Sequence, residues 1–427
     1  MSGINLVNVM LWGRHLGAII ADEQRPGYYL FQYADDLPTH INPSPINMPV
    51  NQSVYGFNLN KGTYQGLPGM ISDSLPDKFG NALMNQYMES MGIAANQVTT
   101  LDRLLYIGKR GMGALEFEPS KALEQKDHYP LAMSDLVESA RKAIQGNFSQ
   151  VANDLIEIGS SAGGARPKAV IGWNRKNKDI IAGQFDLPQE YEHWLLKFDG
   201  VGEDQELGGS DGYGCIEYIY YLMAKDAGIQ MSECRLLEEN GRSHFMTKRF
   251  DRIDNEKIHM QSFCALAHQD FNQPYVTDYS LLLRTAQMLD LGKHEIAQLY
   301  TRMVFNVLAN NCDDHTKNFA FLMNASGVWS LAPAFDVTHA HNPLPDKWTK
   351  QHQMSINGKF AIKDINIDDL LAVAKKFSIN NPIKIINKVK KSLLNWNDLA
   401  KKYNLSDKQR VAIREEIHAK QNHFQVV

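Results

Sequence analysis

One apolar helical pattern constrains the fold of this chain more than any other feature. Residues 294–311 read HEIAQLYTRMVFNVLANN, and apolar side chains recur there at helical spacing. They are Ile296, Leu299, Met303, Val304, Val307 and Leu308. A helix with such a face has to bury it, so we expect a core element here. The densest polar cluster of the sequence, NNCDDHTKNFAFL at 310–322, follows directly.

Composition sets broad limits on the class of protein. A chain of 427 residues that is 44% hydrophobic is long enough for two or three domains. The net charge of −4 gives no basic surface for direct binding to duplex DNA, so any DNA contact would need a basic partner. Four scattered cysteines without a CxxC pair argue against disulfides and thiolate zinc sites. Without a signal peptide or a long apolar run, we expect a cytoplasmic protein with no membrane contact.

The order of patterns predicts an α+β fold. Short apolar runs between turn residues at 4–35 indicate a β-rich opening, and strand-like runs return at 155–253 with one helix at 214–227. From about 278 onward the sequence is mainly helical. We therefore predict four parts: a β-rich subdomain at 1–115, a connector at 116–150, a nucleotide-binding lobe at 151–255 and a helical catalytic lobe at 256–427.

The polar cluster contains the groups that phosphoryl transfer needs. That reaction uses one carboxylate to orient the attacking hydroxyl and oxygen ligands for Mg²⁺. Asp313, Asn318 and, in LAPAFDV at 331–337, Asp336 supply them. Lys317 could lie beside the transferred phosphate, and His315 could hold the loop by hydrogen bonds. The alternative is that Asp and Asn merely end the helix and form a turn.

Two isolated charges upstream add to the phosphoryl-transfer interpretation. Lys197 stands alone in the apolar run HWLLKF, and Glu217 stands alone on the apolar side of the helix IEYIYYLMAKDAG. Isolated charges among apolar residues are costly unless they are paired, so we expect a Lys197–Glu217 contact near the nucleotide phosphates. The alternative is a snorkelling lysine and a solvated glutamate.

The small-residue stretch GSSAGGARPK at 159–168 has more than one interpretation. Gly163 and Gly164 would let backbone N–H groups approach a phosphate. The letters also match a hydrolase elbow with Ser161 as nucleophile, but Pro167 and the apolar residues after it favour a second strand over the required helix. A Walker A loop is excluded because no Lys-Ser/Thr pair follows.

A metal-hydrolase interpretation is also open. Asp313, Asp314 and His315, with His339 and His341, contain the carboxylates and imidazoles that bind several divalent ions. This interpretation leaves Lys197 and the glycine-rich stretch unexplained.

Taken in order, these motifs resemble one known family. The segments SSAGGARPKAVI, HWLLKF, IEYIYYLMAKDAGI, KRFDR, NNCDDHTKNFAFL and LAPAFDV resemble the HipA-type serine/threonine kinases, which include toxins of toxin–antitoxin modules. The resemblance covers about 155–340 and extends weakly toward the N-terminus through GLPGMISDSLPDKFGNAL. It implies a protein-kinase-like two-lobed fold and an ATP- and Mg²⁺-dependent kinase that phosphorylates serine or threonine in proteins.

The resemblance also implies roles for individual residues. Asp313 matches the catalytic aspartate, Asn318 and Asp336 match the Mg²⁺ ligands, and Lys197 matches the lysine on the ATP phosphates. The remaining matches are the phosphate loop at Gly163, Gly164 and Ala165, the adenine connector at Lys248 and Phe250, and the autophosphorylated serine at Ser161, with Ser160 as its neighbour.

Partners follow from the resemblance as well. The family's toxins bind a small DNA-binding antitoxin, so DNA would be contacted only through that partner. Their known protein substrate implies an aminoacyl-tRNA synthetase or another translation factor as the target here. A basic stretch at 375–402 is either a solvated surface or a docking surface for such a substrate. A kinase-like fold that acts only as an antitoxin-binding corepressor is the alternative without enzymatic activity.

Overall fold

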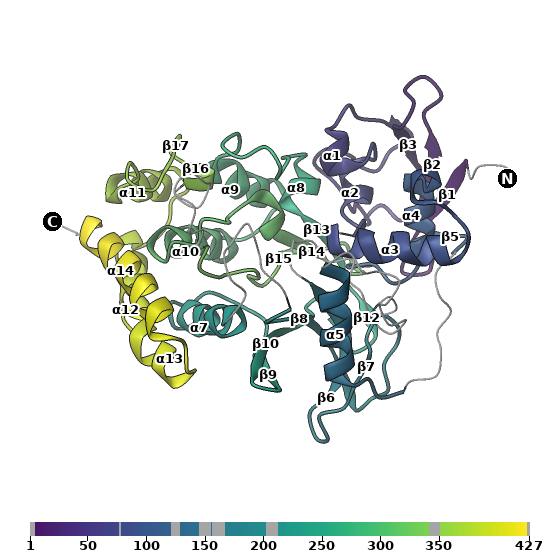
Figure 1. Cartoon of the computed structure of the whole chain (residues 1–427). Coiled ribbons are helices and arrows are strands. Elements are labelled where there is room, and N and C mark those ends of the chain that lie inside the picture. The colour runs from purple at the N-terminus through teal and green to yellow at the C-terminus, as the bar shows by residue number, and fades with distance from the viewer. Residues whose placement is uncertain are drawn as a thin grey trace. The chain divides into compact units, whose positions relative to one another are not determined.

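The computed structural model describes residues 5–76, 78–120, 129–144, 155, 167–201, 212–340 and 351–424 (Figure 1). The chain divides into two compact units, which we call unit 1 and unit 2. Unit 1 comprises Met1–Gly202, Met246–Asp270 and Phe321–Val328, and unit 2 comprises Glu203–Phe245, Phe271–Ala320 and Trp329–Val427. The four-part division predicted from the sequence stays a prediction, and each unit is described below by itself.

Unit 1 begins with an antiparallel sheet. Its strand order is β4-β3-β2-β1-β5, formed by β1 (Leu6–Leu11), β2 (Arg14–Ala21), β3 (Tyr29–Tyr33), β4 (Val54–Tyr55) and β5 (Leu115–Glu118). Alternate residues of β1 are buried, as expected of a strand with one face on a core. The β-rich opening predicted from the apolar runs is thereby confirmed.

Five helical segments lie between β4 and β5 in the chain. They are α1 (Lys61–Tyr64), α2 (Gly69–Ser72), α3 (Lys78–Ser90), the short 3-10 helix η1 (Ala95–Gln97) and α4 (Thr100–Ile107). Thr99 and Asp102 form a reciprocal capping box that starts α4. Helix α5 (Met133–Ile144) follows β5, inside the segment predicted as a connector.

A second five-stranded sheet has the order β7-β6-β8-β10-β9. Its strands are β6 (Lys168–Asn174), β7 (Ile180–Ala182), β8 (Tyr191–Lys197), β9 (Cys234–Glu239) and β10 (Arg242–Lys248). The boundary between the two units falls within β10. All seven residues of β6 are buried, which explains the continuous apolar run that the sequence shows there.

A buried ionic cluster joins two segments of unit 1 around Asp251. Arg249 Nη2 lies 2.6 Å and Arg252 Nη1 lies 2.8 Å from Asp251 Oδ2, which also accepts the backbone N–H of Gly113 at 2.8 Å. Burial opposes ionisation of Asp251, but the two guanidinium charges outweigh it and hold its pKa well below the usual range. The segment KRFDR is therefore tied to the chain just before β5.

Short elements complete the middle of the chain. They are β11 (Arg252–Ile253), β12 (Glu256–Lys257), β13 (His259–Ser262), α8 (Phe263–Leu266), the 3-10 helix η3 (Thr316–Asn318), β14 (Ala320–Met323) and β15 (Trp329–Leu331).

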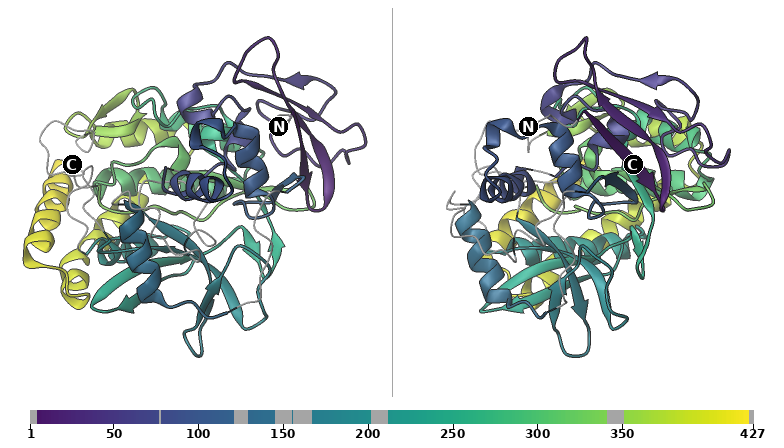
Figure 2. Two further views of the ribbon diagram at one scale, coloured as in Figure 1. Left: turned by 45° about the vertical axis from the view of Figure 1, so that its right-hand side comes forward. Right: turned by 90° about the vertical axis from the view of Figure 1, so that its right-hand side faces the viewer.

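Unit 2 is mainly helical, with α10 (Lys293–Leu308) at its centre. The six apolar residues predicted on one face of this helix are all buried. Around it pack α9 (Tyr279–Met288), α12 (Pro382–Leu393) and α14 (Asp407–His423). The last helices of the chain lie together, in yellow in Figure 2. The remaining elements are α7 (Tyr213–Asp226), β16 (Gln351–Ile356), β17 (Lys359–Ala361), α11 (Ile367–Lys376) and α13 (Trp396–Lys402).

The cysteines and the lengths of the helices are two further features of the fold. All four cysteines are buried and none forms a disulfide. Within the described ranges, no helix combines the length and the apolar character needed to cross a bilayer.

The burial of His259 makes the free energy of unfolding depend on pH. The ring Nε2–H donates to the carbonyl oxygen of Pro43 at 2.9 Å, and burial lowers the pKa of His259 from 6.5 to about 4. The unfolded chain therefore binds a proton that the folded state does not, and stability falls as pH drops below about 6.5. Between about pH 7 and pH 5, His259 alone should cost about 2 kcal/mol of the free energy of unfolding.

Urea unfolding at the two pH values measures this effect. Burial also lowers the pKa of His244 and of His268 to about 4, so His259→Gln should remove only its own share, about 2 kcal/mol, of the parent's pH-dependent difference. The control His15→Gln, at an exposed position of β2, should keep the whole difference. An unchanged pH dependence in His259→Gln would contradict the assignment.

Candidate functional site

The polar cluster begins with a tight turn at the end of α10. Asn310 adopts a left-handed conformation (φ +53°), which Asn tolerates better than most residues. The backbone N–H of Asn311 donates to the carbonyl oxygen of Asn306 at 3.0 Å. Asn310 and Asn311 therefore form a turn directly after the helix, as the simpler interpretation proposed for the asparagines. We call residues 310–318 the polar loop.

Asp314 anchors this loop. Its side chain is fully buried and accepts three hydrogen bonds: from Tyr279 Oη at 2.7 Å, from His352 Nδ1 at 2.8 Å and from the backbone N–H of Gln353 at 2.8 Å. Asn306 Nδ2 donates in turn to Tyr279 Oη at 3.0 Å. A buried carboxylate is tolerated only when such donors satisfy it, so the network fixes the loop to α9 and β16.

The neighbouring Asp313 has a different environment. Its side chain is 36% exposed, and its backbone carbonyl accepts a hydrogen bond from Asn318 Nδ2 at 2.7 Å. The backbone N–H of Asn318 donates to the carbonyl oxygen of His315 at 3.0 Å, within the single turn of η3. These bonds bring Asp313 and Asn318 together and leave the amide oxygen of Asn318 available as an acceptor.

Asp336 reaches the same place from another segment. Residues 331–337 are held by Arg302, whose Nη2 donates to the carbonyl oxygen of Ala332 at 2.7 Å. The backbone N–H of Ala334 donates to the carbonyl oxygen of Gln230 at 2.8 Å. Asp336 itself is left-handed (φ +52°), a conformation that costs free energy for a non-glycine residue and is concentrated at functional sites.

These three residues line one small cavity in unit 2. Its volume is about 20 Å³, enough for a single water-sized occupant, and the buried Asp314 lines it together with them. Arg302 and Asn306 line it as well. Carboxylate and amide oxygens are what Mg²⁺ prefers, so the donor set fits a hard divalent cation.

Arg302 and Asn306, which line this cavity, belong to a polar stripe on α10. Gln298, Arg302 and Asn306 recur every four residues, which places them on one side of the helix. Gln298 receives the backbone N–H of Gln230 and donates to the carbonyl oxygen of Gly228, both at 2.9 Å. The buried Nε of Arg302 has no hydrogen-bond partner within the described part of the chain. We did not predict this stripe, although three polar residues at helical spacing within an apolar helix are visible in the sequence.

The structure places His315 and Lys317 against an aromatic ring that sequence analysis did not single out. The rings of His315 and Phe271 lie 5.3 Å apart, and Lys317 Nζ lies 5.4 Å from the centre of the Phe271 ring. His315 Nε2 is 3.7 Å from Asp313 Oδ1. The roles predicted for the two side chains stay predictions, and the hydrogen bonds that anchor the loop end on Asp314.

The predicted nucleotide-binding residues are distributed over both units. Lys197 is the last residue of β8 in unit 1 and is half-buried, whereas Glu217 is buried in α7 of unit 2. Because the two residues belong to different units, their contact stays a prediction. Lys248 ends β10 and pairs with Glu192 at 2.7 Å, and Phe250 two residues later is half-buried.

The predicted phosphate loop is not part of the described structure. Gly163, Gly164, Ala165 and the serines Ser160 and Ser161 all lie outside the described residues.

The metal-hydrolase alternative finds little support. The carboxylate of Asp314 already accepts the three hydrogen bonds described above. His339 Nε2 lies 2.7 Å from Glu416 Oε2 of α14, so both side chains already have partners. His341 lies outside the described residues. Within those residues, no three His, Cys, Asp or Glu side chains gather in a way that could hold a metal ion. A cation here would depend on the amide oxygen of Asn318.

Comparison with known proteins identifies the family. This α+β chain gathers Asp313, Asp314, Asp336 and Asn318 around one small cavity. The HipA-like C-terminal domain model matches residues 160–417, and the HipA N-terminal domain model matches 7–118. The chain belongs to the HipA family, which confirms the resemblance seen in its motifs.

Two relatives agree with this assignment. The protein named "Putative kinase Y4mE" from Sinorhizobium fredii is 23% identical over 408 residues, which cover 89% of this chain and 87% of that protein. A solved complex of HipA, HipB and operator DNA from Shewanella oneidensis MR-1 matches with a TM-score of 0.66 and 16% identity, over 98% of this chain and 97% of the other. The structural match supports the predicted α+β kinase-like fold.

The two neighbouring aspartates should differ in their effect on stability. Asp314→Asn removes a buried charge that three donors satisfy and should lower the free energy of unfolding by about 2–4 kcal/mol. Asp313→Asn changes a partly exposed side chain and should cost less than about 1 kcal/mol. Urea unfolding of both variants beside the parent protein measures the difference, and equal losses would contradict the anchoring role of Asp314.

Proposed function

We propose that this protein is an ATP- and Mg²⁺-dependent kinase that phosphorylates serine or threonine side chains of proteins. The observation that carries the proposal is the small cavity that Asp313, Asn318 and Asp336 line together, beside the buried Asp314. Membership in the HipA family and the kinase name of a relative support it.

Asp313 is the group proposed to act on the acceptor hydroxyl. Its carboxylate is partly exposed and therefore reachable, unlike that of Asp314. Asp313 accepts the hydroxyl proton as the hydroxyl oxygen bonds to the γ-phosphorus and the bond to the ADP oxygen breaks. Asn318 and Asp336 would hold Mg²⁺, which neutralises charge on the phosphates when it is bound.

The residues predicted to hold the nucleotide keep the roles that the resemblance implies. Lys197 would contact the α- and β-phosphates with Glu217 orienting it, and the chain around Lys248 and Phe250 would meet the adenine. Lys317 would stabilise the transferred phosphate. Gly163, Gly164 and Ala165 would contact phosphates through backbone N–H groups.

Regulation and partners follow from the family. We propose that Ser161, or its neighbour Ser160, accepts a phosphate from the protein's own active site. The relative solved with HipB and operator DNA supports a toxin–antitoxin role here, with a small DNA-binding antitoxin through which DNA is contacted indirectly. The protein substrate would be an aminoacyl-tRNA synthetase or another translation factor.

Transfer of label from γ-labelled ATP tests the proposed activity. In the presence of Mg²⁺ the parent protein should label itself or a protein of a cell lysate, and mass spectrometry should find self-phosphorylation at residue 160 or 161. Asp313→Ala should lower the rate by about 1,000-fold or more, because general-base and positioning effects are lost together. Asp398→Ala, an exposed aspartate of α13, is the matched control and should keep the parent rate.

Three results would contradict parts of this proposal. Transfer that persists in Asp313→Ala would remove Asp313 from the reaction. ATP binding without any transfer would favour the corepressor alternative. Phosphate found only outside residues 160 and 161 would remove the proposed regulatory serine.

The Mg²⁺ dependence tests the role of Asp336. Asp336→Asn removes one negative charge from the proposed ligand set, so about 10-fold more Mg²⁺ should be needed for half-maximal transfer. A Mg²⁺ titration at fixed ATP, with Asp398→Asn as control, measures the shift. An unchanged Mg²⁺ requirement would show that Asp336 is not a ligand.

A further inference from the structure

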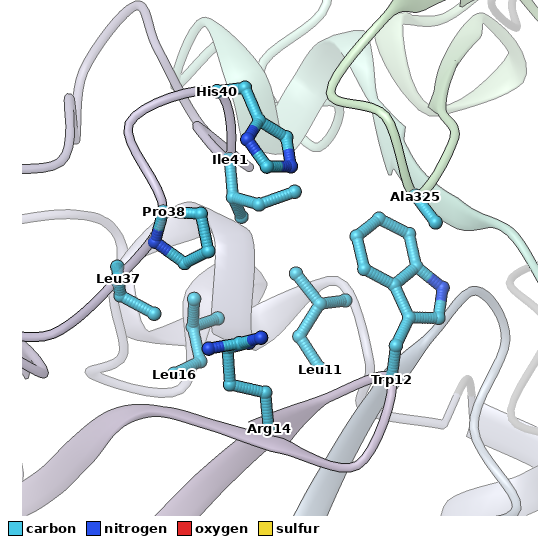
Figure 3. Close-up of a pocket in the computed structure, with 9 residues that line it drawn as sticks. All are labelled: Leu11, Trp12, Arg14, Leu16, Leu37, Pro38, His40, Ile41 and Ala325. Atoms are coloured by element: carbon cyan, nitrogen blue, oxygen red, sulfur yellow. The ribbon is translucent and has the colours of Figure 1, made fainter.

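A second cavity lies in unit 1, and the proposed kinase reaction does not use it. Its volume is about 200 Å³, and three stretches of chain line it: the turn between β1 and β2, residues 37–41 and the turn at Ala325 (Figure 3). An apolar cavity of about 150 Å³ is large enough to hold benzene. This one therefore has room for an aromatic ring with a small substituent.

Trp12 forms one wall in an unusual backbone conformation. Trp12 and Gly13 both have positive φ values, +51° and +72°, in the two-residue turn that joins β1 to β2. Asn or Gly is usual at the first position, and a bulky residue there is costly. The indole Nε1–H donates to the carbonyl oxygen of Lys257 at 2.7 Å, which uses the only polar group of the ring. The indole therefore presents carbon surface to the cavity.

The floor of the cavity is apolar. Leu11, Leu16 and Ile41 are buried there, and Pro38 adds to the wall opposite Trp12 (Figure 3). Such a surface favours an apolar group and gives no reason to bind a fully hydrated ion.

Two polar side chains complete the lining. Arg14 and His40 are both exposed and both line the cavity, and Figure 3 shows their polar ends beside the apolar floor. Neither side chain has a hydrogen-bond or ion-pair partner within the part of the chain that the structure describes. A guanidinium at the edge of an apolar cavity suits a ligand that carries one carboxylate.

Specific contacts fix this arrangement. The backbone N–H groups of Ser326 and Val328 both donate to Asn324 Oδ1 at 3.0 Å, which closes the turn that carries Ala325. A Cβ at Gly327 would lie 1.9 Å from the carbonyl oxygen of His40, so the turn packs directly against the backbone of His40. The cavity is thus built from segments that are remote in sequence, rather than left between loops.

We propose that this cavity binds a small aromatic monocarboxylate. The ring lies between the Trp12 indole and the apolar floor, and the carboxylate accepts hydrogen bonds from Arg14. The cavity shares no residue with the one lined by Asp313, Asn318 and Asp336, so we assign its ligand a regulatory role rather than that of the nucleotide.

Calorimetric titration with phenylacetate tests the proposal on the full chain. Phenylacetate should bind with a dissociation constant in the micromolar to low millimolar range, and phenylacetamide, its neutral isostere, should bind at least about 10-fold more weakly. Arg14→Gln should weaken phenylacetate binding by about 10-fold or more. Arg284→Gln, an exposed arginine on α9 in unit 2, is the matched control and should bind as the parent does.

A second variant tests the cavity itself. Ala325→Phe places a large side chain at the exposed rim and should abolish binding, while thermal unfolding confirms that the variant is folded. Equal binding of the acid and its amide, parent-like binding by Arg14→Gln, or no binding of phenylacetate at millimolar concentration would each overturn the proposal. Binding is measured without ATP, so these outcomes are independent of the kinase activity.

Discussion

The buried carboxylate of Asp314 is the interaction on which the rest of the site depends. It receives donors from α9 and from two consecutive residues of β16, and so joins three stretches of unit 2 at one point. A buried charge that loses its donors is strongly destabilising, so these segments are held in one arrangement. The backbone of the preceding residue in the loop, Asp313, is fixed as a consequence while its side chain stays reachable.

The second half of the site is fixed in a similar way from α10. One side of this helix is apolar and forms the core of unit 2, and its polar stripe holds the segments that surround the cavity. Arg302 donates to the carbonyl oxygen of Ala332, four residues before Asp336. Gln298 accepts the backbone N–H of Gln230, whose own carbonyl oxygen accepts the backbone N–H of Ala334. Catalysis by positioned oxygens requires this rigidity, because misplacement by about 1 Å can cost about 100-fold in rate.

Local sequence patterns predicted part of the fold and the family of the protein. The core helix is confirmed over Lys293–Leu308, three residues short of the end of the predicted stretch, and the α+β class and the family predicted from the order of the motifs are confirmed. The anchoring role of Asp314 could not be predicted, because its partners Tyr279 and His352 are 35 and 38 residues away. Trp12 is a similar case, since its partner Lys257 lies 245 residues along the chain. Such contacts depend on tertiary packing rather than on periodicity or composition.

The central claim is a division of labour between adjacent aspartates, with chemistry on Asp313 and positioning on Asp314. The most direct test is the single-turnover rate of phosphate transfer for Asp313→Asn and Asp314→Asn, measured at a temperature where both are folded. We expect a loss of about 1,000-fold or more for Asp313→Asn and about 10-fold for Asp314→Asn. Equal losses, or a larger loss for Asp314→Asn, would contradict the account.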